Sequence, residues 1–396
     1  MTAAPRRALR KISLFTFTLL VIEYMDEFAF GVREAAWPLI RTDLGLDYAQ
    51  VGILLGLPNF LASLIEPAFG ILGDVWRRRA LILGGGVVFS AALALVAVSP
   101  NFLILLAAFI IFSPASGAFV SLSQATLMDL NPARHAHNMA RWTFAGSVGV
   151  VTGPLALGAA VALGIGWRGL FLGLAALSGA VLLLTWRQRF PPASADPEAE
   201  PGFRAGVRNA GRALRRPAVL RWLTLLEFSY LMLDILLGFL ALYFVDVVGV
   251  SPEQAAGAVA VWTGVGLLGD FLLIPLLERV PGLAYLRVSA ALELVLFPAF
   301  LLAPGYWPKL VALGLLGLFN AGWYAILKGE LYSAMPGQSG TVMAVSNVFG
   351  LAGSLIPLAV GLIAEQLGLG STLWLLLLGP VALLIGLPRS RRPMPV

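Results

Sequence analysis

The run Phe171-Leu-Gly-Leu-Ala-Ala-Leu-Ser-Gly-Ala-Val-Leu-Leu-Leu-Thr-Trp186 contains no charged side chain, and runs of this kind decide the fold class. Similar runs recur along the chain, for example Phe102 to Ile111 and Leu373 to Leu387. Many are long enough, or nearly so, for a helix to cross the hydrocarbon core of a bilayer. Only 12% of the 396 residues are charged and 59% are hydrophobic, which indicates lipid as the solvent. Because lipid leaves no partner for free backbone groups, and the runs exceed the length of barrel strands, the sequence predicts an all-α membrane protein.

Turn residues and charges divide the apolar runs into twelve predicted transmembrane helices in two sets of six. The first set lies near residues 12–38, 48–73, 79–99, 102–129, 138–164 and 168–186. The second set lies near residues 217–245, 252–277, 284–303, 307–333, 339–366 and 370–388. We therefore expect an N-terminal six-helix bundle (1–186), a cytoplasmic linker (187–216) and a C-terminal six-helix bundle (217–396). The basic second part of the linker is either disordered or an amphipathic helix on the anionic inner leaflet.

Basic residues predict the orientation of these helices. If the N-terminus is cytoplasmic, 22 of the 27 Lys and Arg residues fall in internal segments, and five remain: Arg33, Arg41, Arg168, Lys309 and Lys328. This asymmetry predicts a multi-pass protein of the cell membrane with both termini in the cytoplasm. The net charge of +6 comes from short clusters between apolar runs, so it does not indicate nucleic-acid binding.

Several classes of chemistry have no signal in the sequence. There is no cysteine, which excludes disulfides and thiolate metal sites. The two histidines, His135 and His137, fall in a predicted loop and give little ground for a metal site. Because no phosphate-binding loop appears either, we expect neither an enzyme nor an ATP-driven motor, and no cofactor or metal. We expect a monomer.

The two halves also resemble each other. A constant displacement of 204 positions pairs Glu23 with Glu227 and Glu66 with Asp270, and it also matches Gly45 with Gly249 and Gln50 with Gln254. Acids are rare inside membrane helices, so the two acidic matches carry most weight. Duplicated halves are the architecture of carriers that alternate access around a central site.

The segment Gly70-Ile-Leu-Gly-Asp-Val-Trp-Arg-Arg-Arg79 resembles a loop signature of the major facilitator superfamily, G-x-L-x-D-R-x-G-R-R. Val75 and Arg77 depart from that signature. The resemblance implies the major facilitator fold, two pseudo-symmetric six-helix bundles, and a loop that latches the halves on the cytoplasmic side. A plain cluster of positive charge is the alternative explanation. The residues that match in register are Gly70, Leu72, Asp74, Arg78 and Arg79. Of these, the resemblance gives a gating role to Gly70, Asp74, Arg78 and Arg79.

A second segment, Gly149-Val-Val-Thr-Gly-Pro-Leu-Ala-Leu-Gly158, resembles the G-x-x-x-G-P-x-x-G-G signature of the drug/proton antiporters in this superfamily, with Leu157 in place of one glycine. The resemblance implies a conformational role for Gly149, Gly153 and Pro154. Small residues at this spacing also serve ordinary helix contacts. The fourth predicted helix lacks the arginine found in many proton-coupled exporters, so a mechanism that depends on it does not carry over.

Acidic side chains inside the predicted helices are the candidate site. At 100° per residue, the charged residues on one side of the first helix are Glu23, Asp26, Glu27, Arg33 and Glu34. The seventh helix places Glu227, Tyr230 and Asp234 together. Glu66 and Asp270 lie deep in the second and eighth helices, and Lys328 is the main intramembrane base. Ionisable groups in a membrane are expensive and usually functional. Since acids outnumber bases, we expect proton exchange and a cationic cargo. The alternative is that these acids pair, cap helix ends or hold the halves together.

These features predict a secondary transporter that exports a small organic or amphipathic cationic solute in exchange for protons by alternating access. Its partners would be the small-molecule substrate, protons and the lipid bilayer. A proton-coupled symporter of a sugar or organic acid and a divalent-metal exporter fit the same fold. A membrane receptor or assembly protein is the alternative that does not transport.

Overall fold

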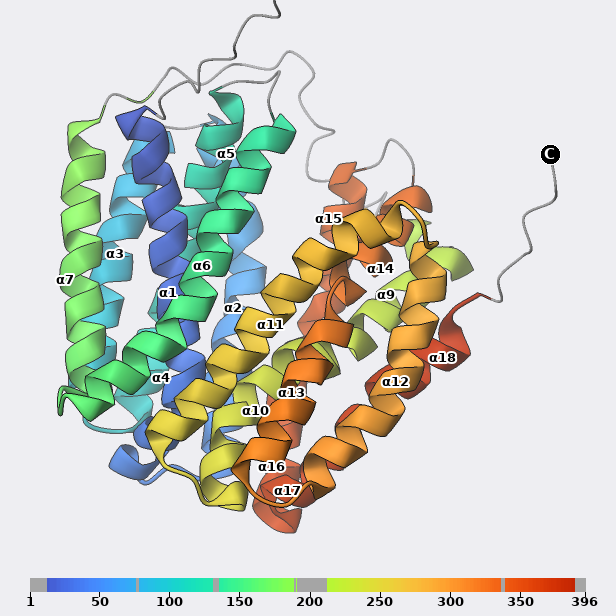
Figure 1. Ribbon diagram of the computed structural model, residues 1–396. Helices are drawn as coiled ribbons and strands as arrows, with labels where there is room; N and C mark the ends of the chain where they lie inside the picture. The colour runs from blue at the N-terminus through green and yellow to red at the C-terminus, as the bar shows by residue number, and fades with distance from the viewer. Residues whose placement is uncertain are drawn as a thin grey trace, which may run out of the picture.

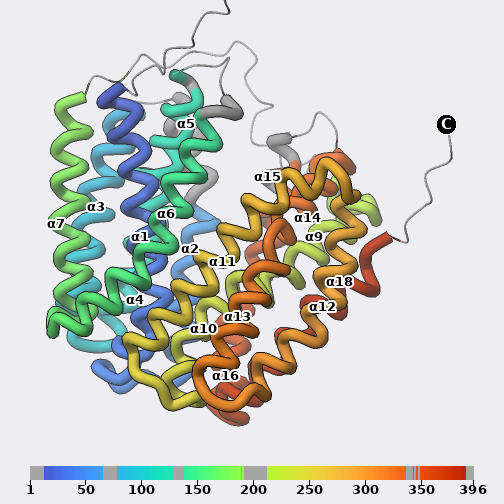
Figure 2. Tube along the Cα trace, viewed as in Figure 1, coloured from blue at the N-terminus to red at the C-terminus, as the bar shows by residue number. Residues whose placement is uncertain are grey.

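The structure is a computed structural model that describes residues 13–75, 78–130, 135–188, 190, 212–335 and 339–388, and it is helical throughout these ranges apart from caps and turns. Within them, the side chains of residues 66–75, 129, 135–137, 339–341, 343, 344 and 347 lie outside the description. Figure 1 shows two groups of helices side by side, and Figure 2 traces the same path as a tube.

The first group contains six membrane-length units. They are α1 (Leu14–Leu44), α2 (Tyr48–Val75), α3 (Arg78–Val98), a fourth unit made of α4 (Phe102–Ser116), the π-helical turn η1 (Gly117–Ser121) and α5 (Leu122–Asp129), then α6 (His135–Ala162) and α7 (Gly166–Arg187). Within this group α1 packs along α6, and α3 packs against α4 and α7.

The second group repeats that order with more interruptions. Its first unit joins α9 (Pro217–Tyr230), η3 (Leu231–Ile235), α10 (Leu236–Leu242) and η4 (Tyr243–Val248), and it is followed by α11 (Pro252–Leu277) and α12 (Gly282–Leu302). The remaining units are α13 (Tyr306–Asn320) with α14 (Trp323–Ser333), α15 (Ser339–Gly353) with α16 (Ile356–Leu367), and α17 (Leu369–Thr372) with η5 (Leu373–Leu377) and α18 (Leu378–Gly386).

The helices are built to sit in a membrane. Among the described residues, eleven helical stretches are long and apolar enough to cross one. The twelfth unit is α1, whose composition differs because it carries five charged side chains between Glu23 and Glu34. The all-α fold of two six-helix bundles is therefore confirmed.

The internal duplication extends to details of the backbone. The first unit of each half ends at a glycine in the left-handed region, Gly45 (φ +62°) and Gly249 (φ +77°), where a side chain would strain the backbone. The next helix of each half begins with a matching side-chain cap. The backbone N–H of Gln50 donates to Asp47 at 2.6 Å, and that of Gln254 donates to Ser251 at 3.3 Å. These features lie 204 positions apart, as do Arg78–Val98 and Gly282–Leu302.

Three features differ from the predicted boundaries. The first helix continues past Pro38 to Leu44, because a proline removes a single backbone donor and the buried surroundings keep the helix intact. The tenth unit breaks at Ala321 and Gly322, and the eleventh breaks after Gly353. The predicted amphipathic helix of the linker, from Arg204 to Arg216, lies outside the described residues except for residues 212–216.

Candidate functional site

The two halves touch most closely at one end of the molecule. We call the end where α1 ends the far face, and the end where α1 begins the linker face. At the far face Arg41 Nη1 lies 2.6 Å from Asp246 Oδ2, and the Tyr48 hydroxyl donates to the same oxygen at 2.8 Å. The Tyr48 backbone N–H donates to Glu365 Oε2 at 2.9 Å. These three contacts join α1 and α2 to the C-terminal half.

Glycines let α2 and α16 approach closely beside these polar contacts. A methyl group added at Gly52 would lie 2.6 Å from the Pro357 carbonyl oxygen, and one at Gly56 would lie 2.6 Å from that of Ser354. Substitution at either position would push backbone against backbone. The far face is thus closed by both packing and ion pairing.

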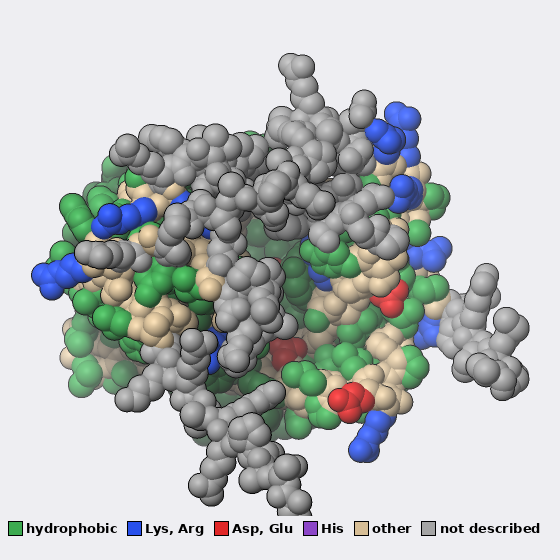
Figure 3. Space-filling model, turned by 90° about the horizontal axis from the view of Figure 1, so that it is seen from above, with side chains coloured by type: hydrophobic (Ala, Val, Ile, Leu, Met, Phe, Trp, Pro, Cys, Tyr) green, Lys and Arg blue, Asp and Glu red, His purple; other side chains and the backbone are tan. Residues whose placement is uncertain are grey.

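A cavity of about 350 Å³ lies between the halves. Figure 3, which views the linker face, shows the surface hollowed between the two bundles, with acidic atoms visible deep in the hollow. Its walls come from α2 on one side and from the interrupted helices of the C-terminal half on the other. The polar lining residues are Asn59, Ser63, Glu227, Tyr230, Asp234, Tyr324, Lys328, Ser346 and Ser354.

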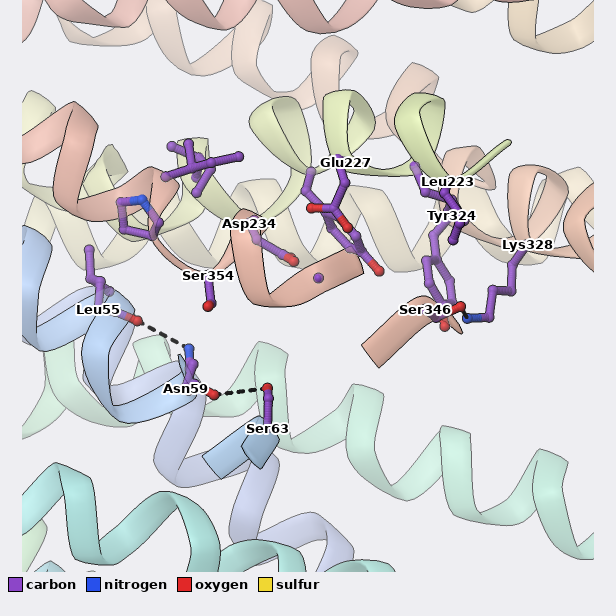
Figure 4. Close-up of a pocket in the computed structure, with 17 residues that line it drawn as sticks. Leu55, Asn59, Ser63, Leu223, Glu227, Asp234, Tyr324, Lys328, Ser346 and Ser354 are labelled. Atoms are coloured by element: carbon purple, nitrogen blue, oxygen red, sulfur yellow. Dashed lines mark hydrogen bonds between the residues drawn. The ribbon is translucent and has the colours of Figure 1, made fainter. Parts of the chain in front are cut away.

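The C-terminal half supplies the charges of this cavity (Figure 4). Glu227 from α9 lies against α15, so close that a methyl group at Gly353 would overlap its Oε2. Lys328 from α14 donates to Ser346 Oγ at 2.7 Å and is an electrostatic neighbour of Glu227. Asp234 comes from the π-helical turn η3. The described lining therefore holds two carboxylates and one ammonium.

Aromatic and neutral groups complete the lining. The rings of Tyr230 and Tyr324 lie 6.2 Å apart at 41°, on the same side as the charges. Across the cavity α2 contributes Asn59 and Ser63, and both are tied to their own helix: Asn59 Nδ2 donates to the Leu55 carbonyl at 3.1 Å, and Ser63 Oγ donates to that of Asn59 at 2.9 Å. Tyrosine faces and amide groups suit an amphipathic guest.

The acids of α1 do not line this cavity. Glu23 is 8% exposed and points at α6, where a methyl group at Gly146 would lie 2.7 Å from its Oε1. Asp26 accepts a hydrogen bond from Ser116 Oγ at 2.8 Å. Glu27 also packs at Gly146 and is an electrostatic neighbour of Asp234. The predicted stripe exists, but it faces the interior of the N-terminal bundle beside the cavity.

The helix α6 makes this placement possible. Methyl groups at Gly149 and Gly153 would lie 2.6 Å from the Tyr24 carbonyl oxygen and 2.7 Å from that of Phe28. Pro154 lies at the same contact, 3.0 Å from a methyl group placed at Gly31. The close helix approach expected of Gly149 and Gly153 is therefore present, and their gating role stays a prediction.

Arg33 pairs with Glu34, its neighbour on the charged side of α1. Its Nε and Nη2 donate to Oε1 of Glu34 at 2.8 and 2.6 Å, and Trp37 Nε1 donates to the other carboxylate oxygen at 3.2 Å. The guanidinium lies 5.0 Å from the centre of the Phe30 ring. This buried pair faces the C-terminal half, since Glu34 Oε2 is 3.6 Å from a methyl group placed at Gly238.

The remaining predicted residues lie away from the cavity or outside the description. Asp270 does not line the cavity; its Oδ1 accepts from the Gly322 backbone N–H at 3.0 Å and so caps the start of α14. The side chains of Glu66, Gly70 and Asp74 are outside the described residues. Arg79 donates to the Trp186 carbonyl at 2.7 Å, and Arg78 begins α3.

The sequence interpretation placed Glu34 on the charged side of α1 without including it among the candidate site residues. It missed two parts of this arrangement, the far-face contacts and Glu293. Asp246 and Glu365 stand near predicted helix ends, where an acid gives no distinctive signal. Glu293 is fully buried in α12, and it could have been found as the acid within the ninth predicted helix.

The described residues form twelve membrane-length helical units in two halves with matched helix caps, and a cavity lies between the halves. This is the architecture of a carrier. The family model of the Major Facilitator Superfamily matches residues 16–357. The chain belongs to the major facilitator superfamily. It is thus a multi-pass integral membrane transporter, and a family of this kind takes a small-molecule substrate.

Proteins similar to this chain carry different names. Transcription regulatory protein OpdE of Pseudomonas aeruginosa is 25% identical over 300 residues, which is 72% of this chain and 71% of that protein. Drug efflux pump JefA of Mycobacterium tuberculosis is 31% identical over 144 residues, which is 36% of this chain and 27% of that protein. A bacterial homologue of the human lysosomal transporter Spinster, solved in an inward-facing and occupied conformation, superposes with a TM-score of 0.74 at 18% identity over 94% of this chain and 93% of its own.

Proposed function

We propose that this facilitator exports a small organic or amphipathic cation in exchange for protons. The observation that carries the proposal is the charge of the cavity, where Glu227 and Asp234 face one base, Lys328, beside the tyrosine pair. Two carboxylates against one ammonium favour a positively charged guest. The rings of Tyr230 and Tyr324 add apolar area and a π face that attracts an organic cation.

Exchange follows from competition for the same carboxylates. A cation that enters the cavity replaces the protons held by Glu227 and Asp234, because a partly dry site does not keep both positive charges. When the site opens to the other side, protons displace the cargo. Lys328, which donates to Ser346, stabilises the ionised form of Glu227 once its proton has left.

We further propose the cell membrane as the location, with both termini and the linker face in the cytoplasm. The arginine clusters at that face support this orientation. The described conformation is then closed outward at Arg41, Tyr48 and Asp246 and hollowed inward. Alternating access requires these far-face contacts to break when the linker face closes.

The comparisons and the site favour this function over its alternatives to different degrees. The similarity to the drug efflux pump JefA supports export of an organic solute. A symporter of anions would place its cargo beside two acids. No group of three potential metal-ligating side chains is found in the described part of the chain, so no specific observation favours a divalent-metal exporter. The similarity to OpdE keeps a regulatory role as an outcome to be tested.

The test uses the purified chain in liposomes with an imposed proton gradient. A panel of organic cations is first screened for thermal stabilisation, because a ligand that binds the folded state raises its melting temperature. For the best binder, we expect cargo movement in one direction and proton movement in the other. Glu227→Gln should abolish both.

Glu278→Gln serves as the matched control, because Glu278 is an exposed carboxylate at the end of α11. It should transport as the wild-type protein does. Undiminished, proton-coupled flux in both Glu227→Gln and Asp234→Asn would reject the site assignment. Absence of flux for every cation that binds would favour a receptor or assembly role.

A further inference from the structure

A second acidic position lies inside the C-terminal half, away from the cavity. Glu293 is 0% exposed in α12, and within the described residues neither of its carboxylate oxygens has a hydrogen-bond partner. Asn320, 3% exposed at the end of α13, likewise has no partner for either amide atom in the described part of the chain. Buried polar atoms are nearly always satisfied, so these two side chains require an explanation.

The face of α12 that carries Glu293 looks toward the break between α13 and α14. Tyr285, Ser289 and Glu293 follow one another at intervals of four residues, which places them on one side of the helix. The Tyr285 hydroxyl is 3.1 Å from the Ala321 carbonyl oxygen and 3.3 Å from that of Phe319. These two residues flank Asn320, which therefore lies beside the same face of α12.

The first residue of α14 connects this face to the transport cavity. Trp323 Nε1 donates to Ser289 Oγ at 2.9 Å, one turn from Glu293. The same helix carries Tyr324 and Lys328 into the cavity. A movement of α14 on cargo binding would consequently alter the surroundings of Glu293.

Within the described residues, no ion pair joins Glu293 to a base. The base on its own helix is Arg287, whose buried Nη2 likewise has no hydrogen-bond partner there. The electrostatic neighbour of Glu293 is Tyr285 on the same helix. Of the other elements packed against α12, η5 and α18 carry no titratable side chain. On α13, the Tyr306 hydroxyl donates to the Gln254 carbonyl at 3.1 Å. Lys309 of α13 donates to the Tyr243 hydroxyl and to the carbonyls of Phe300 and Leu301 at 2.7–2.8 Å. The titratable side chains described on α14 are Tyr324, Lys328, Glu330 and Tyr332.

We propose that Glu293 is a proton-binding site within the C-terminal half, which holds a proton behind α14 while the transporter is in the described conformation. An ionised carboxylate without a partner costs many kcal/mol in a dry interior, whereas its neutral acid costs far less. A proton is the smallest occupant that removes the charge. The presence of a proton at Glu293 does not depend on the proposed function. The exchange of that proton with the cavity through α14 does depend on it.

Infrared difference spectroscopy of the full chain in lipid nanodiscs tests the bound proton directly. The wild-type protein should show a carbonyl stretch of a protonated carboxyl group at neutral pH, shifted when H₂O is replaced by D₂O. Glu227 and Asp234 add carbonyl bands of their own when protonated, so the Glu293 band is the component that Glu293→Gln removes and that Glu227→Gln, Asp234→Asn and Glu278→Gln leave. Glu293→Asp keeps an acid at the position and should move the band, which gives a second readout if the glutamine variant folds poorly.

Two outcomes overturn the proposal. A band that is unchanged in both Glu293→Gln and Glu293→Asp belongs to another residue. A band that appears only when Na⁺ is replaced by choline would make Na⁺ the occupant of the wild-type site.

Exchange of this proton with the cavity through α14 has its own test. Trp323→Phe removes the hydrogen bond to Ser289 and should speed the shift of the band in D₂O. Equal exchange rates in the variant and the wild-type protein would reject exchange through α14. A transporter with no proton-coupled flux but with this band would reject the proposed function alone.

Discussion

The two halves place a glutamate at equivalent positions and give it different surroundings. Glu23 and Glu227 are 204 positions apart, and so are Gly146, against which Glu23 packs, and Gly350, which lies beside Glu227. Gly149 and Gly353 have the same spacing, but Gly353 contacts Glu227 whereas Gly149 contacts Tyr24, Glu27 and Phe28. In the N-terminal half the glutamate is enclosed between α1 and α6. In the C-terminal half it lines the cavity.

The difference comes from the helix that carries the glycines. In the N-terminal half α6 continues unbroken past Gly149, and its backbone at Val150 lies against Gly31 of α1. In the C-terminal half α15 ends at Gly353, and Ser354 and Ile356 beyond it line the cavity. A broken helix thus opens space where its intact counterpart fills it, so the glutamate is a buried contact in one half and lines the cavity in the other.

The largest expected effect separates the two glutamates in cargo binding. Glu227→Gln should raise the Kd of the best-binding cation by roughly ten- to a hundred-fold, because it removes a charge-assisted contact of about 1.5–3 kcal/mol. Glu23→Gln should change the Kd little, since Glu23 does not line the cavity. Titration calorimetry measures both. Equal losses in the two variants would break the comparison.

A glycine pair sharpens the assignment within the C-terminal half. Gly353→Ala should displace the Glu227 carboxylate and so weaken cation binding. The overpacking itself should lower the free energy of unfolding by about 1–3 kcal/mol. Gly350→Ala is the control, because its methyl group would lie 3.8 Å from Glu227 Oε1, an ordinary contact. The two Kd values should differ clearly. If Gly353→Ala binds the cation as tightly as the wild-type protein does, the Glu227 carboxylate does not lie against Gly353.

The matching glycine of the N-terminal half should affect stability and leave binding intact. Gly149→Ala drives a methyl group against the α1 backbone, 2.6 Å from the Tyr24 carbonyl oxygen, so α1 and α6 must separate. We expect the free energy of unfolding to fall by about 1–3 kcal/mol, and the melting temperature to fall with it. Thermal unfolding in detergent measures the shift, with Gly173→Ala as control because a methyl group there meets open space.

The smallest expected effect concerns the far-face contact. Asp246→Asn weakens its contacts with Arg41 and Tyr48, and a partly exposed ion pair contributes only about 0.2–1 kcal/mol. The population with an open far face should rise several-fold at most. Since the chain has no cysteine, spin labels at Leu163→Cys and Trp307→Cys report the distance across this face without background. An unchanged distance distribution would show that the Arg41–Asp246 pair does not help to hold the far face closed.

The sequence predicted the helices well and the interruptions poorly. The apolar runs and turn residues located α2, α4 to α5 and α11 at their starts, because membrane helices need long apolar segments. The break at Gly322 depends on tertiary partners, namely the Asp270 carboxylate and the Tyr285 hydroxyl. Such partners come from other helices, and a local pattern does not reveal them.

The sequence predicted those residues of the candidate cavity that come from the C-terminal half. Glu227, Tyr230, Asp234 and Lys328 line the cavity as a set. The spacing in α1 also gave the correct acidic stripe, but a helical pattern does not say which of two neighbours that stripe faces. The glycines of α6 decide this by allowing α1 to approach.

Proton release on cargo binding tests the central claim most directly. The purified protein is mixed with the best-binding cation in weakly buffered detergent solution, and released protons are counted with a pH indicator. The account predicts release by the wild-type protein and by Glu278→Gln, and little or none by the Glu227→Gln, Asp234→Asn double variant at saturating cation. Equal release by that double variant would contradict it.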